Sequence, residues 1–149
     1  MKTLVYLCGT ITNDRRHLDW RKYIADALAE YNIGSLSPVR GKDPPCWRQE
    51  DVAGAVYDNG AFVARDYRDI QNSDALFVMF TKKEHVKRQS LGTWMELGYA
   101  KAMDIPVVIV TDIEEIADHP FIKDVAARIC KTVDEGIAYT AWLLMPGVE

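Results

Sequence analysis

Glu96 is the first residue whose type and position suggest chemistry. It lies in the segment 90–100, SLGTWMELGYA, a short way after an apolar run of strand length at 75–80, ALFVMF. In a helix predicted over about 93–103, the acid shares a face with Tyr99, Ala100 and Met103. Open α/β sheets bind ligands at the carboxyl ends of their strands, where the following helices begin. The pattern therefore predicts an acid in the first turn of a helix at that edge of the sheet.

Two interpretations of Glu96 remain open at this point. The quartet 93–96, TWME, fits a capping box, in which Thr93 is the N-cap and Glu96 reaches back to the Thr93 amide. The positive end of the helix dipole also favours an acid there. Alternatively, the carboxylate has a functional role, because an acid on an apolar stripe costs free energy unless it is paired.

Two further polar segments approach the same edge of the sheet. The strand at 3–7 runs into the small and hydroxyl residues of 8–13, CGTITN, which let backbone amides come close to a ligand. The segment 66–74, DYRDIQNSD, precedes the strand at 75–80 and contains three carboxylates, Asp66, Asp69 and Asp74. Acids in such places are also typical of solvated helix faces and N-caps, and Asp74 is predicted to cap or turn the chain into the strand.

Three segments form a combined pattern: 6–10 (YLCGT), 66–70 (DYRDI) and 90–100 (SLGTWMELGYA). In this order and at this spacing, within about residues 4–110, they resemble the nucleoside 2-deoxyribosyltransferase family. The resemblance implies that Glu96 attacks C1′ of a 2′-deoxyribonucleoside, expels the base and forms a covalent deoxyribosyl-enzyme. A second base, or water, then collects the sugar. A carboxylate suits this displacement because it stabilises an oxocarbenium-like transition state before it bonds.

The resemblance also implies roles for other residues. Tyr6 matches the family's first-strand tyrosine, whose hydroxyl orients the nucleophile; by itself it reads as an ordinary strand aromatic. Asp66 matches the base-contacting aspartate, and protonation of the leaving base lowers the barrier by about 10²–10⁴-fold. Asp69 would hydrogen-bond the base or tune the pKa of Asp66 through like charge. Gly9 and Thr10, in the turn after the first strand, are expected to bind substrate.

Position 90 distinguishes two branches of the family. The best-known transferases carry an aspartate six residues before the nucleophile, whereas this chain has Ser90. Ser90 and Gly92 instead resemble the 5′-phosphate-binding residues of the 2′-deoxynucleoside 5′-monophosphate N-hydrolases, since a neutral hydroxyl suits a phosphate better than a carboxylate. Thr10 and Thr12 stand where those hydrolases carry a serine and an arginine. We predict a transferase, with the N-hydrolase as the alternative.

Composition bounds the remaining possibilities. The 149 residues suit one domain, 1–149, with 48% hydrophobic and 27% charged residues. A net charge of −4 argues against binding of duplex DNA or RNA, so the expected partners are a deoxynucleoside or deoxynucleotide and a free nucleobase. The three cysteines and three histidines have no metal-ligand spacing, and no metal or cofactor is expected. Without a membrane span or signal peptide, the protein is predicted to be soluble and cytoplasmic.

The elements that must position these residues follow a βα alternation. Apolar runs occur at 4–7, 35–39, 75–80, 107–110 and 128–132, separated by helical patterns. They predict an α/β fold, a single-domain doubly wound and mostly parallel five-stranded sheet of flavodoxin or Rossmann type with helices on both faces. Asp19 is predicted to cap the first helix, with Tyr23 and Tyr31 in its buried stripe and Asn32 at its end. The final helix is predicted over about 133–144, with Trp142 on its apolar side.

Three expectations concern the surroundings of the site. Trp47, in the long connection 39–60, is expected to pack onto the body, with closure over a base as the other possibility. His119 would reach the sugar or phosphate in a neighbouring subunit, or else serve as an N-cap or surface histidine. The cleft is short of side chains to enclose a sugar, so a homodimer or larger homo-oligomer is expected. The alternative of another class is a nucleotide-binding sensor that does not cleave its ligand.

Overall fold

The computed structural model describes residues 2–10, 16–39, 59–82 and 91–146. Along these ranges the elements are β1 (Leu4–Gly9), α1 (Arg16–Ala29), β2 (Gly34–Leu36), α2 (Asn59–Gln71), β3 (Ala75–Phe80), α3 (Leu91–Ala102), β4 (Val107–Thr111), α4 (Glu114–Ala117), α5 (Pro120–Val125), β5 (Ala126–Cys130) and α6 (Val133–Leu143). The predictions for Thr12, Trp47 and Ser90 fall outside the described residues.

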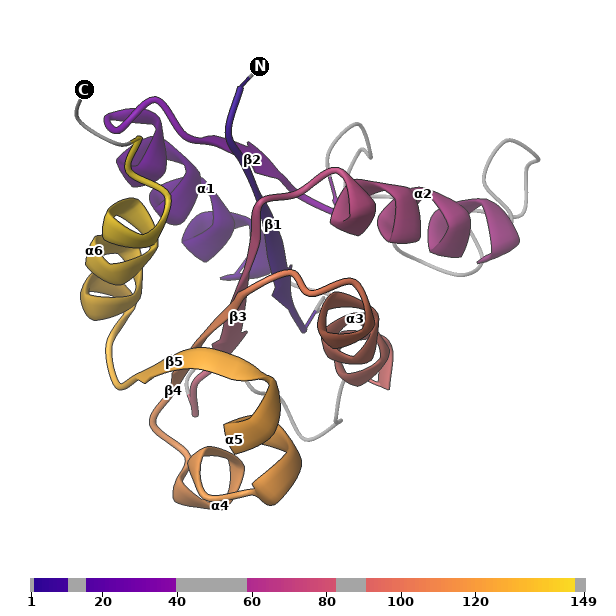
Figure 1. Cartoon of the computed structure of the whole chain (residues 1–149), viewed down its shortest axis with the longest axis vertical. Coiled ribbons are helices and arrows are strands. Elements are labelled where there is room, and N and C mark those ends of the chain that lie inside the picture. Colours follow the sequence, from indigo (N-terminus) through magenta and orange to yellow (C-terminus); the bar gives the residue numbers. More distant parts are fainter. Residues whose placement is uncertain (1, 11–15, 40–58, 83–90, 147–149) are drawn as a thin grey trace.

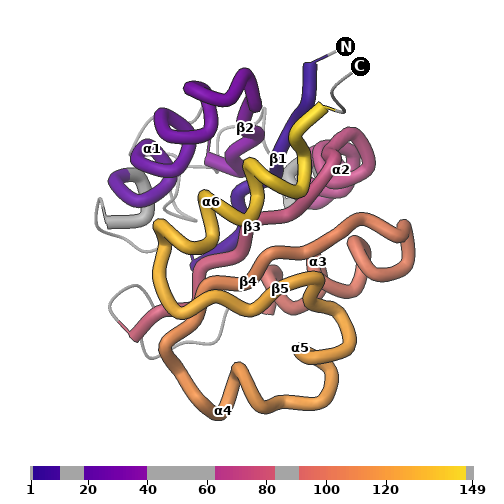
Figure 2. The backbone as a smooth tube through the Cα atoms, turned by 60° about the vertical axis from the view of Figure 1, so that its left-hand side comes forward, coloured from indigo at the N-terminus to yellow at the C-terminus, as the bar shows by residue number. Residues whose placement is uncertain are grey.

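The strands form one parallel sheet in the order β2-β1-β3-β4-β5, which confirms the predicted α/β class. α1 and α6 cover one face and α2 and α3 cover the other, as Figure 1 shows on the left and right of the sheet. Figure 2 shows the same layers turned by 60°. The strand order reverses between β1 and β3, and at such a switch point a crevice opens at the carboxyl ends of the strands.

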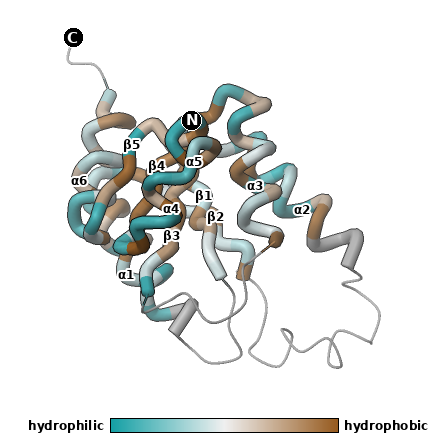
Figure 3. Tube along the Cα trace, turned by 90° about the horizontal axis from the view of Figure 1, so that it is seen from below, coloured by the Kyte–Doolittle hydropathy of each residue, from teal (hydrophilic) through white to brown (hydrophobic). Residues whose placement is uncertain are grey.

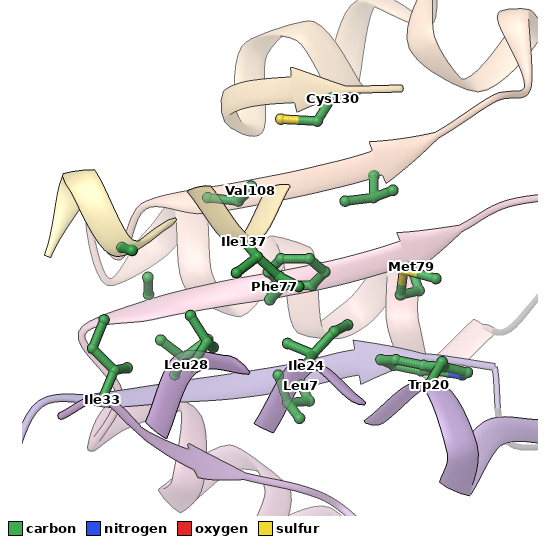
Figure 4. Packing of buried hydrophobic residues seen from close by; sticks show 14 residues of the cluster. Leu7, Trp20, Ile24, Leu28, Ile33, Phe77, Met79, Val108, Cys130 and Ile137 are labelled. Carbon is green, nitrogen blue, oxygen red and sulfur yellow. The ribbon is translucent and has the colours of Figure 1, made fainter. Parts of the chain in front are cut away.

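The alternation of side chains along β1 divides the core into two clusters. Val5 and Leu7 point toward α1 and α6, where they pack with Trp20, Phe77 and Ile137 (Figure 4). The other cluster, on the side of α2 and α3, includes Tyr6, Cys8, Ile70, Phe80 and Leu97. Tyr6 and Cys8 therefore share the face of β1 that lies toward α2 and α3.

Several predicted boundaries were wrong by a few residues. α1 begins at Arg16, so Asp19 lies inside its first turn and does not cap it. Asn32 ends the helix as predicted, with a φ of 60° in the left-handed region. α3 begins at Leu91, two residues earlier than expected, which moves Glu96 from the first helical turn into the second. β5 also begins earlier than expected, because it follows α5 without an intervening loop.

Three aromatic residues predicted to be buried or on an apolar side are exposed. Tyr23 and Tyr31 of the expected α1 stripe are half exposed, and Tyr23 donates a hydrogen bond to Asp134 at 2.7 Å. Their phenol oxygens favour contact with water or a polar partner. Trp142 on α6 is 65% exposed and packs at its ring against Tyr139.

Asp74 lies at the bend that leads into β3, as predicted, and its side chain also contacts β1. Its carboxylate accepts a hydrogen bond from the Leu4 amide at 2.8 Å, just before β3 begins. Figure 3 shows that α1 and α3 carry both hydrophilic and hydrophobic positions, as expected for helices that cover a sheet. Within the described ranges, no helix combines the length and the apolar character needed to cross a lipid bilayer.

Candidate active site

Glu96 receives two hydrogen bonds from neighbouring side chains of β1. The Tyr6 hydroxyl donates to Oε1 at 2.8 Å, and the Cys8 thiol donates to Oε2, also at 2.8 Å. Tyr6 and Cys8 are completely buried, and the Glu96 side chain is half-buried. Each carboxylate oxygen thus has a donor of its own, which holds the group in one orientation.

The topology explains why residues so far apart in sequence meet here. Tyr6 and Cys8 are two residues apart on β1, so both side chains leave the same face of the strand. β3 pairs directly with β1, and α3 is the helix that follows β3. Thr93, Leu97 and Ala100 form the buried face of α3, and Glu96 lies beside that face. The carboxylate therefore points at the carboxyl end of β1, at the switch point of the sheet.

The capping-box interpretation of Glu96 is wrong. Thr93 is the third residue of α3 and not its N-cap, because the helix begins at Leu91. The Glu96 oxygens are instead hydrogen-bonded to Tyr6 and Cys8. The helix dipole acts mainly within the first turn, so at Glu96 it helps the anion less than the sequence pattern suggested.

Opposing effects set the ionisation of Glu96. Burial raises the pKa of its carboxyl above the ordinary value, because a low-dielectric surrounding disfavours the anion. The hydrogen bonds from Cys8 and Tyr6 lower the pKa, nearby Asp66 raises it, and the positive charge of Arg21 lowers it. The net result is a raised pKa, so the donors and Arg21 oppose burial without overcoming it.

Tyr6 and Cys8 both keep their protons in this site. Burial raises the pKa of the Tyr6 hydroxyl far above its usual range, and the negative charges of Glu96 and Asp66 raise it further. Burial and then Glu96 likewise raise the pKa of the Cys8 thiol. Both groups therefore act as hydrogen-bond donors at neutral pH, and neither serves as a base.

Arg21 brings a buried guanidinium to the end of β1. It lies on α1 and is only 3% exposed; its Nη2 donates to the carbonyl oxygen of Gly9 at 2.9 Å. The guanidinium carbon lies 4.1 Å from the centroid of the Trp20 ring. This contact ties α1 to the strand end that carries Cys8 and adds positive charge near Glu96.

The two aspartates of α2 lie one helical turn apart. Asp66 is close enough to raise the pKa values of both Tyr6 and Glu96, and its Oδ1 lies 3.9 Å from Nε of Arg65. Its side chain is 22% exposed, so it is reachable from solvent. Asp69 is buried, and its backbone carbonyl accepts a hydrogen bond from Ser73. Of the two acids, Asp66 is the one that the structure brings to Glu96.

The end of β1 approaches its neighbours closely. A Cβ at Gly9 would lie 2.9 Å from the ring of Trp20 and 3.3 Å from the carbonyl oxygen of Met79, so a larger residue would displace the strand end or the ring. The Thr10 hydroxyl oxygen is buried without a hydrogen-bond partner among the described residues. It is a polar group that a ligand at the strand end would satisfy.

Gly92 and His119 lie apart from the Glu96 carboxylate contacts. Gly92 is exposed in the first turn of α3, and a Cβ there would meet nothing within 4 Å. His119 is the exposed N-cap of α5, where its Nδ1 accepts from the Phe121 amide at 3.3 Å. It lines a cavity of about 630 Å³ between α3, α4 and α5, together with Trp94, which stacks on Phe80. The N-cap interpretation of His119 is therefore the one that the structure bears out.

Sequence reasoning missed three residues of this site: Cys8, Thr93 and Arg21. The spacing of Cys8 from Tyr6 on a strand was a usable signal, and so was the spacing of Thr93 from Glu96 on a helix, because both put the residues on one face. Arg21 lies three residues before Ile24 and seven before Leu28, both buried on α1, so its place in the inward stripe was also visible. In the described part of the chain, no group of His, Cys, Asp and Glu side chains is arranged to hold a metal ion.

Comparison with known proteins identifies relatives of this chain. The family model described as nucleoside 2-deoxyribosyltransferase matches residues 5–137. No curated protein sequence matches the chain.

Solved structures with the same fold include enzymes of two kinds. A 2-deoxyribosyltransferase from Bacillus psychrosaccharolyticus has a TM-score of 0.68 at 18% identity, over 99% of this chain and 100% of that one. A 2-desoxiribosyltransferase from Leishmania mexicana has a TM-score of 0.70 at 13% identity, over 94% and 97%. The CMP N-glycosidase BcmB from Clostridium botulinum has a TM-score of 0.59 at 14% identity, over 94% and 99%. At these identities the likeness establishes the shared fold.

Proposed function

The chain belongs to the nucleoside 2-deoxyribosyltransferase family, and we propose that it transfers 2-deoxyribose between nucleobases with Glu96 as the nucleophile. The observation that carries the proposal is the pair of hydrogen bonds from Tyr6 and Cys8 to the two oxygens of Glu96. A carboxylate held in this way at the switch point of a doubly wound sheet is suited to attack a bound ligand.

In the first step, a lone pair of a Glu96 oxygen forms a bond to C1′ of the deoxynucleoside as the bond from C1′ to the base nitrogen breaks. The bonding electrons leave with the base, which takes up a proton. In the second step, a nitrogen of another base attacks C1′, loses a proton and releases the Glu96 carboxylate. Two displacements at C1′ return the original configuration, as in retaining glycosidases.

Asp66 is the group we assign to the proton transfer. Its side chain is partly exposed and close to both Glu96 and Tyr6, as expected for a residue that meets the leaving base. It would donate a proton to the base in the first step and recover one from the acceptor base in the second. Gly9 and Thr10, at the end of β1, and Asp69, one helical turn after Asp66, are the further residues we assign to substrate binding.

The second candidate is the 2′-deoxynucleoside 5′-monophosphate N-hydrolase, with water as the acceptor. The observation that favours it is the sequence of the segment before Glu96: Ser90 stands where the transferases carry an aspartate, and Ser90 and Gly92 together resemble the phosphate-binding residues of the hydrolases. Gly92 lies in the first turn of α3, where a Cβ would meet nothing within 4 Å, and the amides of a first helical turn favour an anion.

One experiment separates these candidates. Purified protein is incubated with a panel of deoxynucleosides and their 5′-monophosphates, each with and without a different free base, and the products are resolved by chromatography. A new deoxynucleoside that forms only with acceptor base supports the transferase. Release of base and deoxyribose 5-phosphate from monophosphates without an acceptor supports the hydrolase. Binding without turnover would contradict both and support a sensor.

We also propose that the active form is a homodimer or larger homo-oligomer. Leu91 and Met95 lie one turn apart on α3, beside the site helix residue Glu96, and are 77% and 58% exposed. Apolar side chains exposed next to a site are suited to cover by another subunit, which would also enclose the sugar. Light scattering on the active protein tests the proposal, and a fully active monomer would contradict it.

A further inference from the structure

Cys8 has an unusual position for a cysteine in a cluster of apolar residues. It is completely buried on β1, and its Sγ lies 2.8 Å from Oε2 of Glu96. A buried cysteine normally packs as a small apolar residue. Here it contacts the carboxylate that the proposed reaction uses, on the opposite oxygen from Tyr6.

We propose that Cys8 is a positioning residue, whose thiol proton holds Oε2 of Glu96 while the Tyr6 hydroxyl holds Oε1, so that the carboxylate faces C1′ in a single orientation. This inference rests on the proposed function of Glu96 as the nucleophile. Without the second donor, the carboxylate could rotate about its last torsion, which is broad for a carboxylate side chain.

Thr93 gives the thiol a defined direction. It is buried on α3, one turn before Glu96, and its hydroxyl forms a hydrogen bond with the Cys8 thiol that lowers the thiol pKa. A hydrogen bond that favours the thiolate is one in which the hydroxyl donates to sulfur. The thiol proton is then left to point toward Glu96, so Thr93 donates to Cys8 and Cys8 donates to the Glu96 carboxylate.

The Cys8 thiol keeps its proton in this position. Burial and the charge of Glu96 keep the pKa of Cys8 raised, so the proton stays on sulfur throughout the working pH range.

Among the described residues, the groups that shift the pKa of Glu96 come from three other elements. Tyr6 and Cys8 come from β1, Asp66 from α2 and Arg21 from α1. The hydrogen bond from Cys8 lowers the pKa of Glu96, so its removal should be measurable in the titration of Glu96. Cys130 offers a matched control, because it is a buried thiol on β5 in the cluster on the opposite face of the sheet.

The test compares Cys8→Ala, Cys8→Ser and Cys130→Ala in two measurements. The first is the pH dependence of kcat and KM for base release or transfer. We expect Cys8→Ala to lower kcat about three- to tenfold with little change in KM. The acid limb of the pH–rate profile, where protonation of Glu96 reduces kcat, should move to higher pH. Cys8→Ser should restore a donor and return the limb to the wild-type pH or below it. Cys130→Ala should leave kcat and the limb unchanged.

The second measurement does not depend on turnover. The carboxyl of Glu96 is titrated by carbon-13 NMR in protein labelled at glutamate, with the signal assigned by its loss in Glu96→Gln. We expect Cys8→Ala to move this titration to higher pH and Cys130→Ala to leave it in place. An unchanged titration and an unchanged kcat in folded Cys8→Ala would overturn the inference, as would equal losses in both alanine variants.

The two measurements also keep the inference separate from the proposed function. If the wild-type protein releases no base from any nucleoside, the proposed function fails, while the NMR titration still reports whether Cys8 holds Glu96. If turnover is present and Glu96→Ala abolishes it, but Cys8→Ala changes neither kcat nor the titration, only the inference about Cys8 fails. Melting temperatures of the three variants show whether loss of activity follows loss of stability.

Discussion

The two faces of β1 differ in the side chains that pack against them. Val5 and Leu7 point into a cluster of apolar side chains packed so closely that a Cβ at Gly136 of α6 would lie 2.6 Å from Val110 Cγ2. Tyr6 and Cys8 point the other way and surround a carboxylate whose ionised form is disfavoured by burial. One strand thus contributes to the apolar core through one face and to the candidate site through the other, because successive side chains alternate.

The largest expected effect is on the chemical face, at Glu96. Glu96→Ala should abolish the sugar adduct and lower turnover by about 10⁴-fold or more, because the nucleophile is lost. Mass spectrometry of protein quenched with substrate detects the adduct, and chromatography measures turnover. Turnover at the wild-type rate would contradict the proposed mechanism.

The same position should show a gain in stability. The pKa of Glu96 is raised in the folded chain, so the stability that this group contributes is greatest at low pH and falls as the pH rises through the folded value. At neutral pH, where an exposed glutamate is ionised, the raised pKa of Glu96 therefore costs stability. We expect Glu96→Gln to raise Tm by roughly 3 °C in calorimetry while remaining inactive. A clear decrease in Tm would show that the anion is stabilised in the fold.

Asp66→Asn should have the next largest effect. Loss of a proton donor to the leaving base should slow base release by about 10²–10⁴-fold and leave the fold intact. The change also removes a negative charge that raises the pKa of Glu96, so the acid limb of the pH profile should move to lower pH. Substrates whose base leaves readily should be less affected, and an equal loss for all bases would argue against proton transfer.

Tyr6→Phe should lower kcat less than Asp66→Asn does, and it should move the acid limb of the pH–rate profile in the opposite direction. It removes a hydrogen bond to a charged oxygen, worth about 1.5–3 kcal/mol, and should lower kcat by roughly 10- to 100-fold. Because a donor that lowers the pKa of Glu96 is lost, the acid limb should move to higher pH. A pH–rate profile of each variant shows the two shifts, and shifts in one common direction would contradict this electrostatic account.

The smallest effect on turnover is expected on the packing face. Gly136→Ala should cost about 1–3 kcal/mol of stability, because its Cβ would overlap Val110 and the ring of Phe77, while turnover well below Tm should be unchanged. Gly98→Ala on α3 is the matched control, since a Cβ there meets nothing within 4 Å. It should stabilise the helix by about 0.5–1 kcal/mol in denaturant unfolding. A loss of turnover in folded Gly136→Ala would show that the two faces are coupled.

Much of this arrangement was predictable because it depends on local periodicity. The apolar runs and the amphipathic helices determine a parallel sheet, and a parallel sheet brings the ends of β1 and β3 together. Glu96 was recognisable as an acid on an apolar stripe. Its true partners were harder to predict, because Thr93 and Glu96 also match a common local motif and only the start of the helix decides between the two.

Other features depend on tertiary contacts that periodicity does not contain. Cys8 looks like a small apolar strand residue until a carboxylate from another element lies beside it. Arg21 was obscured by its charge, since guanidinium groups are usually solvated and this one is buried by its contact with Gly9 and Trp20. For Tyr23 and Trp142 the opposite prediction was wrong: both were expected on an apolar side and are exposed, because an aromatic residue at a helical spacing need not be buried.

The hydrogen bond between Tyr6 and Glu96 joins residues 90 positions apart in the chain. During synthesis, β1 leaves the ribosome long before Glu96 is added to the chain, and we expect the contact to form only after β3 has paired with β1. In refolding from denaturant, the recovery of turnover should therefore follow the slow formation of long-range strand pairs and lag behind the recovery of helical circular dichroism. The recovery of turnover during refolding would thus report when the sheet is complete.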